Sequence, residues 1–354
     1  MEQVLNVEIK NYKITISDDD FSKTMEKVNF ITSSQKRLFV VSNKVFKLYS
    51  EKLGLDKNEV LVLPDGEKHK NFKTYIKILE TAAQKGLTRN DVIIGIGGGV
   101  IGDIAGFAAS TYMRGIDYIQ IPTTLLAMVD SSVGGKTAID MKDAKNIVGT
   151  FHQPKAVFIN INFLKTLDKR QFKTGLGEIL KYAFIEENCK HKQALYLFEY
   201  LTLCCDKLFE QEPMTVMRVI EYCLLLKIAV VNEDEKESGL RKVLNFGHTL
   251  GHALEVKGKY KKYTHGEAVV QGIFFALNWA FKVELISYSY HRLATELLNK
   301  YGFKETKIKN LPELIEIMKK DKKATTDKIT FLIPCDKKKV KEVKFRPEEI
   351  LEMF

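Results

Sequence analysis

The sequence predicts an N-terminal Rossmann-like α/β domain followed by a mainly α-helical domain. Up to about residue 160, short β-branched runs alternate with helical stretches, which is the pattern of βα units on a mainly parallel sheet. After about residue 165, the pattern changes to long amphipathic helices. No repeat or low-complexity linker separates the two, so we place the domains at residues 1–160 and 161–354 and expect them to share a cleft.

The expected elements follow from periodicity along the chain. We predict a hairpin at the sheet edge within residues 4–16, and strands at 38–42, 60–63, 92–96, 118–122 and 156–161. We predict helices at 171–186, 193–210, 214–231, 240–256 and 266–283. Residues 328–334 and 340–344 suit a small hairpin, and Arg346, Pro347 and Glu348 open a final helix.

Composition and charge narrow the class of protein. The 354 residues are 45% hydrophobic and 28% charged, and no apolar run reaches the roughly 20 residues of a membrane span. The first residues lack a signal-peptide pattern, so we expect a cytoplasmic protein without a membrane partner. The net charge of +10 comes from scattered lysines without an RNA-binding pattern, which disfavours nucleic acid and suits a multiply anionic small substrate. The five cysteines show no C-x-x-C spacing, so neither disulfides nor a thiolate zinc site is expected.

A glycine-rich turn follows the strand at 92–96. Gly97, Gly99 and Gly102 satisfy G-x-G-x-x-G between a strand and a helix, where backbone N–H groups can approach a pyrophosphate closely. The turn does not follow the first strand and lacks an acidic residue about 20 positions later, which disfavours an ordinary Rossmann dehydrogenase. A tight structural turn remains the alternative.

A set of polar side chains suggests a metal site. Arg241, Asn245, His248 and His252 are spaced by 4, 3 and 4 residues, which places them on one face of the helix predicted at 240–256. His265 opens the next helix. Imidazoles from separate helices plus one carboxylate make a three-ligand zinc site with an open position, and Glu178 is the best carboxylate candidate. The Glu of H-E-x-x-H is missing, which disfavours a metalloprotease, and structural core histidines remain the alternative.

A third polar cluster follows the strand at 118–122. Thr123, Thr124, Asp130 and Lys136 come after its carboxyl end, where ligands of α/β folds bind. Lys145, Asn146 and Arg114 add further polar groups nearby. A solvated Ser/Gly/Lys loop is the alternative interpretation.

Taken together, these motifs resemble the 3-dehydroquinate synthase family. The likeness is carried, in family order, by residues 65–70, 97–103, 123–137, 163–166, 177–182, 241–252 and 265–269, and so extends through nearly the whole chain. The resemblance implies an α/β domain that binds NAD, a helical domain that holds zinc or cobalt, an active site between them, and a homodimer.

The resemblance also implies roles for individual residues. It makes Glu178, His248 and His265 the metal ligands, and it makes His252, which spacing alone would favour as a ligand, a substrate-site histidine. Its substrate-pocket residues are Arg114, Asp130, Lys136, Asn146, Lys181, Lys227, Arg241, Asn245, His252 and Lys322. Its cofactor-binding residues are Asn43, Asp65, Gly66, Glu67, Lys68, His69, Lys70, Gly99, Val100, Ile101, Gly102, Asp103, Thr123, Thr124, Lys136, Lys145, Phe163, Leu164, Lys165 and Thr166. Many relatives have Asp where this chain has Asn43, which leaves the adenosine contact in question.

The implied reaction converts 3-deoxy-D-arabino-heptulosonate 7-phosphate to 3-dehydroquinate and phosphate. It proceeds by transient oxidation by NAD, β-elimination of phosphate, re-reduction, and intramolecular aldol closure. Two alternatives are another NAD- and metal-dependent sugar-phosphate cyclase and a metal-dependent polyol dehydrogenase. A noncatalytic nucleotide-binding or basic interaction protein is a third.

Overall fold

The computed structural model describes residues 1–7, 11–142, 144–191, 196–321 and 328–352. The chain forms two compact units, Met1–Leu167 and Asp168–Phe354. The strands of the first unit are β1 Glu2–Val7, β2 Tyr12–Ser17, β3 Arg37–Ser42, β4 Val60–Leu63, β5 Val92–Gly97, β6 Asp117–Pro122, β7 Lys136–Met141, β8 Ala144–Phe151 and β9 Ala156–Asn160. Its α-helices are α1 Phe21–Ile31, α2 Asn43–Tyr49, α3 Phe72–Gln84 and α4 Gly99–Thr111. Its shorter helical turns are η2 Lys57–Glu59, η3 Glu67–His69, η4 Tyr112–Arg114, η5 Ala127–Ser131 and η6 Ile161–Thr166.

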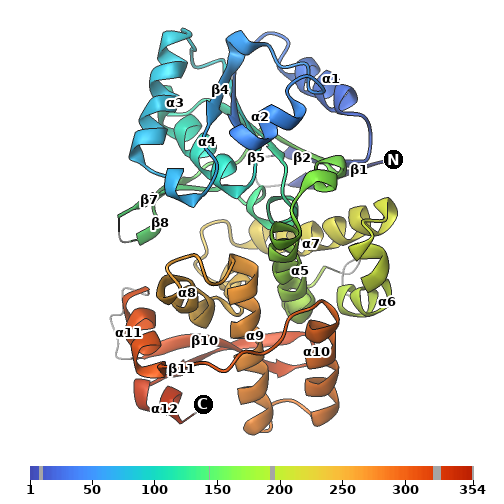
Figure 1. The fold of residues 1–354 in the computed structure, drawn as a ribbon, viewed down its shortest axis with the longest axis vertical. Helices are drawn as coiled ribbons and strands as arrows, with labels where there is room; N and C mark the ends of the chain where they lie inside the picture. The colour runs from blue at the N-terminus through green and yellow to red at the C-terminus, as the bar shows by residue number, and fades with distance from the viewer. Residues whose placement is uncertain (8–10, 143, 192–195, 322–327, 353–354) are drawn as a thin grey trace. The chain divides into compact units, whose positions relative to one another are not determined.

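The main sheet of the first unit confirms the expected parallel arrangement (Figure 1). Among the described residues it has seven strands in the order β1-β2-β9-β6-β5-β3-β4, and all neighbours are parallel except β1 and β2. The antiparallel β1–β2 pair is the hairpin predicted at the sheet edge. Parallel pairing brings the carboxyl ends of β9, β6, β5, β3 and β4 to one edge of the sheet, where the polar motifs of this unit begin.

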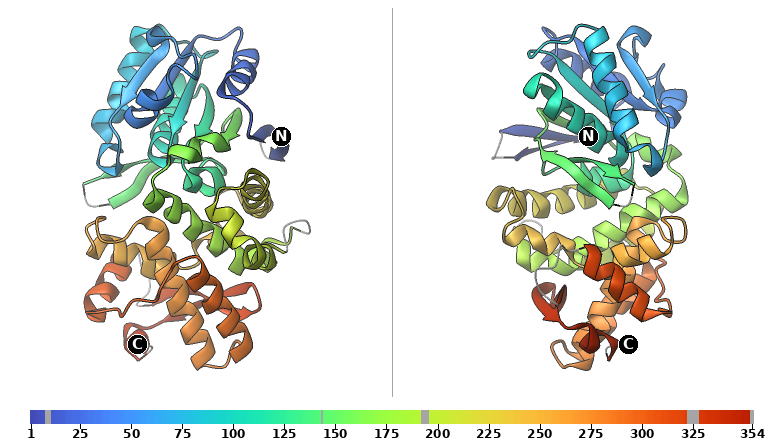
Figure 2. Two further views of the ribbon diagram at one scale, coloured as in Figure 1. Left: turned by 45° about the vertical axis from the view of Figure 1, so that its right-hand side comes forward. Right: turned by 90° about the vertical axis from the view of Figure 1, so that its left-hand side faces the viewer.

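The core of the first unit lies between the sheet and the helices α3 and α4. Leu38, Val40 and Ile93 on the strands pack with Ile104 on α4 and Ile78 on α3, and all five are buried. Figures 1 and 2 show α3 and α4 together on one side of the sheet, with α1 on the other. Because apolar side chains cover both faces of the central strands, these strands read as continuous rather than alternating apolar runs.

A small hairpin in the first unit was missed by the sequence interpretation. Residues 123–137 read as a polar loop, but Ala127–Ser131 is helical and Lys136 begins strand β7, which pairs with β8 in antiparallel fashion. Strand β8 contains only partly buried and exposed residues, and its sequence does not alternate strictly between apolar and polar side chains, so its β-pattern is weak. The hairpin places Lys136 at the start of β7. Asn146 lies on β8 with a left-handed φ of +55°, next to a shift in the pairing register between Ile139 and Met141.

The second unit is mainly helical. Its helices are α5 Lys169–Cys189, α6 Leu197–Phe209, α7 Pro213–Glu233, α8 His248–Lys257, α9 His265–Lys282, α10 Tyr288–Lys300, α11 Leu311–Asp321 and α12 Pro347–Leu351, with the turn η8 Leu240–Asn245. Strands β10 Ile329–Asp336 and β11 Lys339–Phe345 form the antiparallel hairpin that the sequence predicts. The helix expected from residue 193 begins at Leu197, and residues 193–195 lie outside the described ranges.

Helix starts in the second unit follow from local capping. The side chain of Asp168 accepts a hydrogen bond from the Gln171 N–H at 2.9 Å, which starts α5. Thr264 and Glu267 form a reciprocal capping box that starts α9. Both helices therefore begin at positions that the sequence specifies locally, and α9 begins at a histidine.

The prediction of one continuous helix at 240–256 is wrong. Gly247 adopts a φ of +78°, in the left-handed region, and separates η8 from α8. A Cβ at Gly247 would lie 2.5 Å from the Val269 carbonyl oxygen on α9, so the close approach of the two segments requires glycine here. Arg241 and Asn245 therefore do not share a helical face with His248 and His252.

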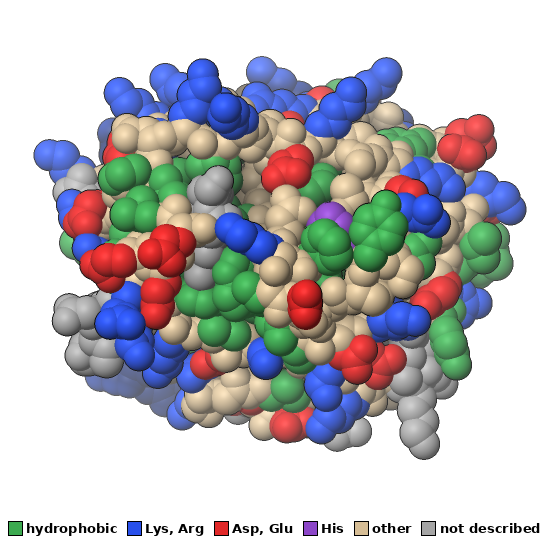
Figure 3. Space-filling view, turned by 90° about the horizontal axis from the view of Figure 1, so that it is seen from below, with side chains coloured by type: hydrophobic (Ala, Val, Ile, Leu, Met, Phe, Trp, Pro, Cys, Tyr) green, Lys and Arg blue, Asp and Glu red, His purple; other side chains and the backbone are tan. Residues whose placement is uncertain are grey.

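The surface carries both signs of charge. On the face shown in Figure 3, Lys and Arg side chains are spread with acidic side chains between them rather than gathered in one continuous stripe. Within the described ranges, no helix combines the length and the apolar composition that crossing a membrane requires.

Candidate metal and nucleotide sites

One carboxylate and two imidazoles converge in the second unit. Glu178 lies on α5 and is fully buried, while His248 and His265 are the first residues of α8 and α9. The Glu178 Oε1 atom lies 3.7 Å from His248 Nε2 and 3.3 Å from His265 Nε2. These three atoms are close enough to bind one metal ion together. The predicted ligand set is therefore assembled in one place.

Close packing of α5 against α9 brings this cluster together. A Cβ at Gly177 would lie 2.5 Å from the backbone oxygen of Gly266, so a larger residue would push the two helices apart. Gly177 and Gly266 are the direct neighbours of Glu178 and His265. The glycine pair therefore sets how near the carboxylate comes to the imidazole.

Hydrogen bonds at Nδ1 orient both imidazoles. The His248 Nδ1–H donates to the Phe246 carbonyl oxygen at 3.0 Å, and the His265 Nδ1–H donates to Glu255 Oε2 at 3.1 Å. A carbonyl or carboxylate oxygen can only accept, so Nδ1 must carry the hydrogen in both rings. In each ring Nε2 is then the nitrogen left to bind a metal ion, and both Nε2 atoms face Glu178.

In the metal-free protein, burial and neighbouring charges shift the pKa values of the two histidines in opposite directions. Burial lowers the pKa of His248 to about 3, against the opposing attraction of Glu178. Burial would also lower the pKa of His265, but hydrogen bonds to Glu178 and Glu255 outweigh it and raise that pKa to about 10. At pH 8, His248 is therefore neutral and His265 is protonated.

We predict that metal binding at pH 8 releases about one proton per ion, because the metal must displace the proton on His265. Apparent affinity should rise with pH up to about 10, since the competing proton is progressively lost. Zinc titration in weak buffer with a pH indicator measures the release. Stoichiometric binding without any proton release would contradict this prediction, because His265 would then be neutral before the ion binds.

Further charged groups surround the carboxylate. Lys181 is buried, and its Nζ lies 2.5 Å from Glu178 Oε2. The His252 ring centroid lies 5.3 Å from that of His248 and 6.2 Å from that of His265. His252 is therefore beside the cluster, one helical turn after His248, as the family resemblance implies.

Arg241 and Asn245 sit on the turn η8, away from the α8 face. Arg241 is buried, its backbone N–H donates to Asp234 Oδ2 at 3.0 Å, and its guanidinium donates to the Glu235 carbonyl. The Asn245 Nδ2 atom donates to Glu237 Oε1 at 2.5 Å. Lys227 on α7 is also buried. Burial of Lys181, Lys227 and Arg241 in one unit is unusual for structural cations and suits recognition of an anion.

The predicted nucleotide residues of the first unit follow the carboxyl ends of parallel strands. Asn43 begins α2 directly after β3, and the Asp65 carboxylate, after β4, accepts the Lys44 N–H at 3.1 Å. Thr123 and Thr124 follow β6, and the Thr123 N–H donates to the Gly97 carbonyl at 2.9 Å. The remaining nucleotide residues follow β4, β5 and β9 or lie on the β7–β8 hairpin, namely Gly66, Glu67, Lys68, His69, Lys70, Gly99, Val100, Ile101, Gly102, Asp103, Lys136, Lys145, Phe163, Leu164, Lys165 and Thr166.

The amino end of α4 offers a cradle for a phosphate. Gly98 caps the helix, and a Cβ there would lie 3.0 Å from Thr124 Cγ2, so a side chain would crowd the space in front of the helix. The first N–H groups of a helix lack intrahelical partners and attract anions. The glycine-rich turn therefore fits a pyrophosphate, as its G-x-G-x-x-G pattern predicts.

An ion network joins this helix to the β7–β8 hairpin. The buried Lys70 Nζ lies 2.6 Å from Asp103 Oδ2 on α4 and donates to Asn146 Oδ1 on β8. Burial opposes the charge of Lys70, but the carboxylates of Asp103 and Glu67 outweigh it and raise its pKa. Asp140 Oδ1 accepts the Asn146 N–H at 2.9 Å. One predicted substrate residue is thus linked to two predicted cofactor residues.

The other predicted positions are more peripheral or buried. Lys136 and Arg114 are exposed, and Arg114 has a left-handed φ of +68°. The ring of Phe163 packs 4.9 Å from that of Tyr49, and Leu164 is buried, so these two offer a ligand their backbone rather than their side chains. Asp130 lies on η5, and Lys322 lies outside the described residues.

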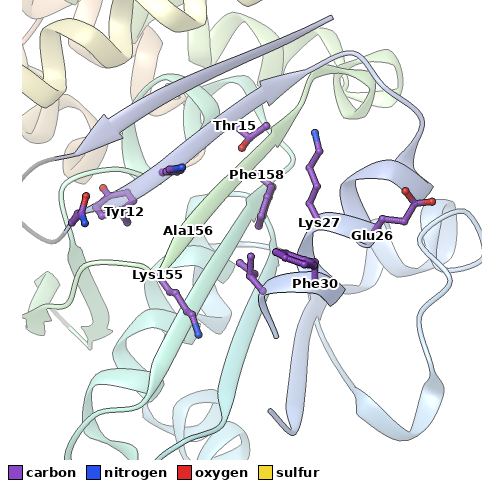
Figure 4. Close-up of a pocket in the computed structure, with 11 residues that line it drawn as sticks. Tyr12, Thr15, Glu26, Lys27, Phe30, Lys155, Ala156 and Phe158 are labelled. Atoms are coloured by element: carbon purple, nitrogen blue, oxygen red, sulfur yellow. The ribbon is translucent and has the colours of Figure 1, made fainter. Parts of the chain in front are cut away.

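A pocket of about 540 Å³ lies elsewhere in the first unit. It is lined by residues of α1, β2 and β9, including Phe30, Phe158 and Lys27 (Figure 4). None of the predicted site residues lines it. We therefore do not place the active site there.

Sequence reasoning missed three acidic residues that hold predicted site residues. Glu255, Glu237 and Asp140 accept hydrogen bonds from His265, Asn245 and Asn146. Glu255 follows His248 by seven residues on α8, a spacing that places both on one helical face and could have indicated it. Asp140 and Glu237 depend on the hairpin and on a left-handed turn, which the sequence pattern does not show.

Comparison with known proteins decides the family. The 3-dehydroquinate synthase N-terminal family model matches residues 60–174, and the C-terminal model matches residues 175–324. A 3-dehydroquinate synthase from Dictyoglomus thermophilum is 41% identical over 341 residues, covering 96% of this chain and 94% of the relative. The chain belongs to the 3-dehydroquinate synthase family. A member of this family from a Thermoanaerobacter species is 40% identical over 99% of this chain and 98% of its own length.

Solved structures share the fold at lower identity. A 2-epi-5-epi-valiolone synthase from Streptomyces hygroscopicus, with NAD⁺ and Zn²⁺ bound, superposes with a TM-score of 0.83 at 23% identity, over 99% of this chain and 98% of that one. A 2-deoxy-scyllo-inosose synthase complexed with carbaglucose-6-phosphate, NAD⁺ and Co²⁺ gives 0.81 at 23% identity, with the same coverage. An iron-containing alcohol dehydrogenase gives 0.65 at 16% identity, over 100% of this chain and 98% of that one. These structures confirm the predicted fold class for this 3-dehydroquinate synthase family member, and the fold alone does not choose among the chemistries.

Proposed function

We propose that this chain converts 3-deoxy-D-arabino-heptulosonate 7-phosphate to 3-dehydroquinate and phosphate. The observation that carries the proposal is the buried Glu178, His248 and His265 cluster in a chain about 40% identical, over nearly its whole length, to 3-dehydroquinate synthases. In this proposal, the buried cations of the second unit bind an anionic substrate. It also uses both polar sites, the metal cluster and the nucleotide cradle.

The residues present fit both cofactors. Two imidazole nitrogens and one carboxylate suit zinc or cobalt in a site with an open position, and the Gly98 cradle suits the pyrophosphate of NAD. Bound NAD supplies a reversible hydride acceptor, and a bound divalent ion supplies a Lewis acid. We propose Glu178, His248 and His265 as the metal ligands.

The remaining polar residues bind and orient the substrate in this proposal. Lys136, Asn146, Arg241 and His252 are proposed to bind the phosphate, and Lys227 with Arg241 or Asn245 the carboxylate. Lys181, next to Glu178, stabilises the negative charge of that buried carboxylate. The substrate phosphate can itself accept the proton removed before it leaves, so that the protein contributes mainly positioning and electrostatics.

We predict that Lys136→Ala lowers kcat/KM for the heptulosonate phosphate about 100-fold. The variant removes a charge-assisted hydrogen bond to phosphate, which contributes roughly 1.5–3 kcal/mol. Steady-state phosphate release measures the change. Lys142→Ala, an exposed lysine at the turn of the same hairpin, is the matched control and should keep normal turnover. A near-normal kcat/KM for Lys136→Ala would show that Lys136 does not bind the phosphate as proposed.

Substrate choice separates this function from its nearest rivals. Purified protein loaded with zinc and NAD should release phosphate from the heptulosonate phosphate and not from glucose 6-phosphate. Turnover of the hexose phosphate alone would assign the chain to another cyclase. NADH accumulating in proportion to product, without phosphate release, would indicate a polyol dehydrogenase.

We also propose a cytosolic homodimer, as the family resemblance implies. Sedimentation at micromolar concentration should give twice the mass of the 40.5 kDa chain. A monomer with full turnover would contradict this assignment without affecting the proposed reaction.

A further inference from the structure

Glu255 is hydrogen-bonded to the predicted metal ligand His265, but the sequence analysis assigns no role to Glu255. Glu255 Oε2 lies 3.1 Å from His265 Nδ1, on the side of the ring opposite to Nε2, and the Glu255 side chain is buried. Glu255 lies on α8 and His265 begins α9, so the bond joins the helices that supply the two imidazoles.

The two imidazoles are held by different kinds of acceptor. His248 donates from Nδ1 to a backbone carbonyl, that of Phe246, which no substitution of a side chain removes. His265 donates to a carboxylate, which adds negative charge as well as an acceptor. A carboxylate behind a ligating imidazole fixes its tautomer and makes Nε2 a stronger donor to a metal.

We propose that Glu255 is a positioning residue for the metal site: it holds His265 with Nδ1 protonated and Nε2 directed at the ion bound by Glu178 and His248. This inference rests on the proposed metal site. Glu255 acts through His265 and does not itself bind the ion.

A competing arrangement shares Glu255 and His265. His252, Glu255 and His265 also offer ligand atoms close enough for one ion, so Glu255 would then be a ligand of a different or second metal centre. The 3.1 Å bond to Nδ1 favours the positioning role, because a ring that donates from Nδ1 to Glu255 cannot bind a metal through that nitrogen.

The test compares Glu255→Ala and Glu255→Gln with wild-type protein, using zinc affinity measured against a chelator and the visible spectrum of the cobalt-loaded form. We expect Glu255→Ala to weaken zinc binding about 10- to 100-fold and to alter the cobalt bands. Glu255→Gln keeps a neutral oxygen that can accept from Nδ1–H, so it should restore most of the affinity and the wild-type bands.

Glu267→Gln is the matched control for a purely structural effect. Glu267 lies two residues from His265 and caps α9, but its carboxylate accepts the Thr264 N–H rather than an imidazole. We expect this variant to lower the thermal stability of the metal-free protein and to leave zinc affinity and the cobalt spectrum unchanged.

The outcomes separate the inference from the function on which it rests. If the wild-type protein binds neither zinc nor cobalt, the proposed metal site itself is contradicted. Wild-type binding that Glu255→Ala leaves unchanged would overturn the inference alone. Two ions per wild-type chain, with one lost in Glu255→Ala and the other bound as tightly as before, would overturn it in favour of the His252, Glu255 and His265 centre.

Discussion

Glu178→Gln is expected to abolish tight metal binding and to lower turnover by about 1,000-fold or more. The substitution keeps the size of a fully buried side chain but removes the anionic ligand that both Nε2 atoms face. A Lewis acid that stabilises developing charge contributes several kcal/mol of transition-state stabilisation. Its loss raises the activation free energy by that amount, and each 1.36 kcal/mol is a factor of ten in rate. Metal content after dialysis and phosphate release measure the two effects.

Glu186→Gln is the matched control for this variant. Glu186 is also a fully buried carboxylate on α5, two helical turns after Glu178, but it pairs with Lys338 at 2.7 Å and not with the histidines. It should keep its metal and its turnover. If Glu178→Gln is folded by circular dichroism and retains one tightly bound ion with turnover within tenfold of wild type, Glu178 is not a ligand.

Gly247→Ala should destabilise the helical unit by about 3 kcal/mol. A residue with a Cβ loses roughly 1–2 kcal/mol in the left-handed conformation, and overpacking adds about 1–3 kcal/mol. Here the added Cβ would lie 2.5 Å from the Val269 carbonyl oxygen. The chain has a single tryptophan, Trp279 on α9, so its fluorescence reports the unfolding of this unit in urea.

Gly302→Ala isolates the backbone part of that cost. Gly302 is also left-handed, with a φ of +75°, but nothing lies within 4 Å of the position of a Cβ. It should lose only the roughly 1–2 kcal/mol of conformational strain. Gly247→Ala should in addition weaken zinc binding, because His248 follows it directly. Equal losses of stability in the two variants would show that the contact with α9 is not tight.

The sheet and most helices could be predicted from the sequence because their patterns are local. The β5 run is apolar throughout and is bounded by turns, and α9 begins with its own capping box. The break at Gly247 could not be predicted in this way, because it depends on α9 approaching from a distant part of the chain. Apolar residues before and after Gly247 continued the helical period and concealed the break.

The candidate site, like the fold, could be predicted from the sequence only in part. Histidine spacing on α8, the histidine that opens α9 and Glu178 as the best carboxylate candidate indicated a metal site. The family resemblance, not spacing, selected His248 and His265 over His252 as its imidazole ligands. Geometry then added Glu255, whose role depends on the Nδ1 hydrogen bond across two helices. Sequence patterns show which side chains are available, whereas hydrogen-bond partners across elements require the fold.

The most direct test of the proposed function counts turnovers per NAD. Zinc-loaded protein with substoichiometric NAD is given 3-deoxy-D-arabino-heptulosonate 7-phosphate, and phosphate and 3-dehydroquinate are followed in the same sample. We expect equal amounts of both products and many turnovers per NAD, because the cofactor is restored in each cycle. No turnover despite confirmed binding of metal and NAD would contradict the proposed function and point to a cyclase with another substrate.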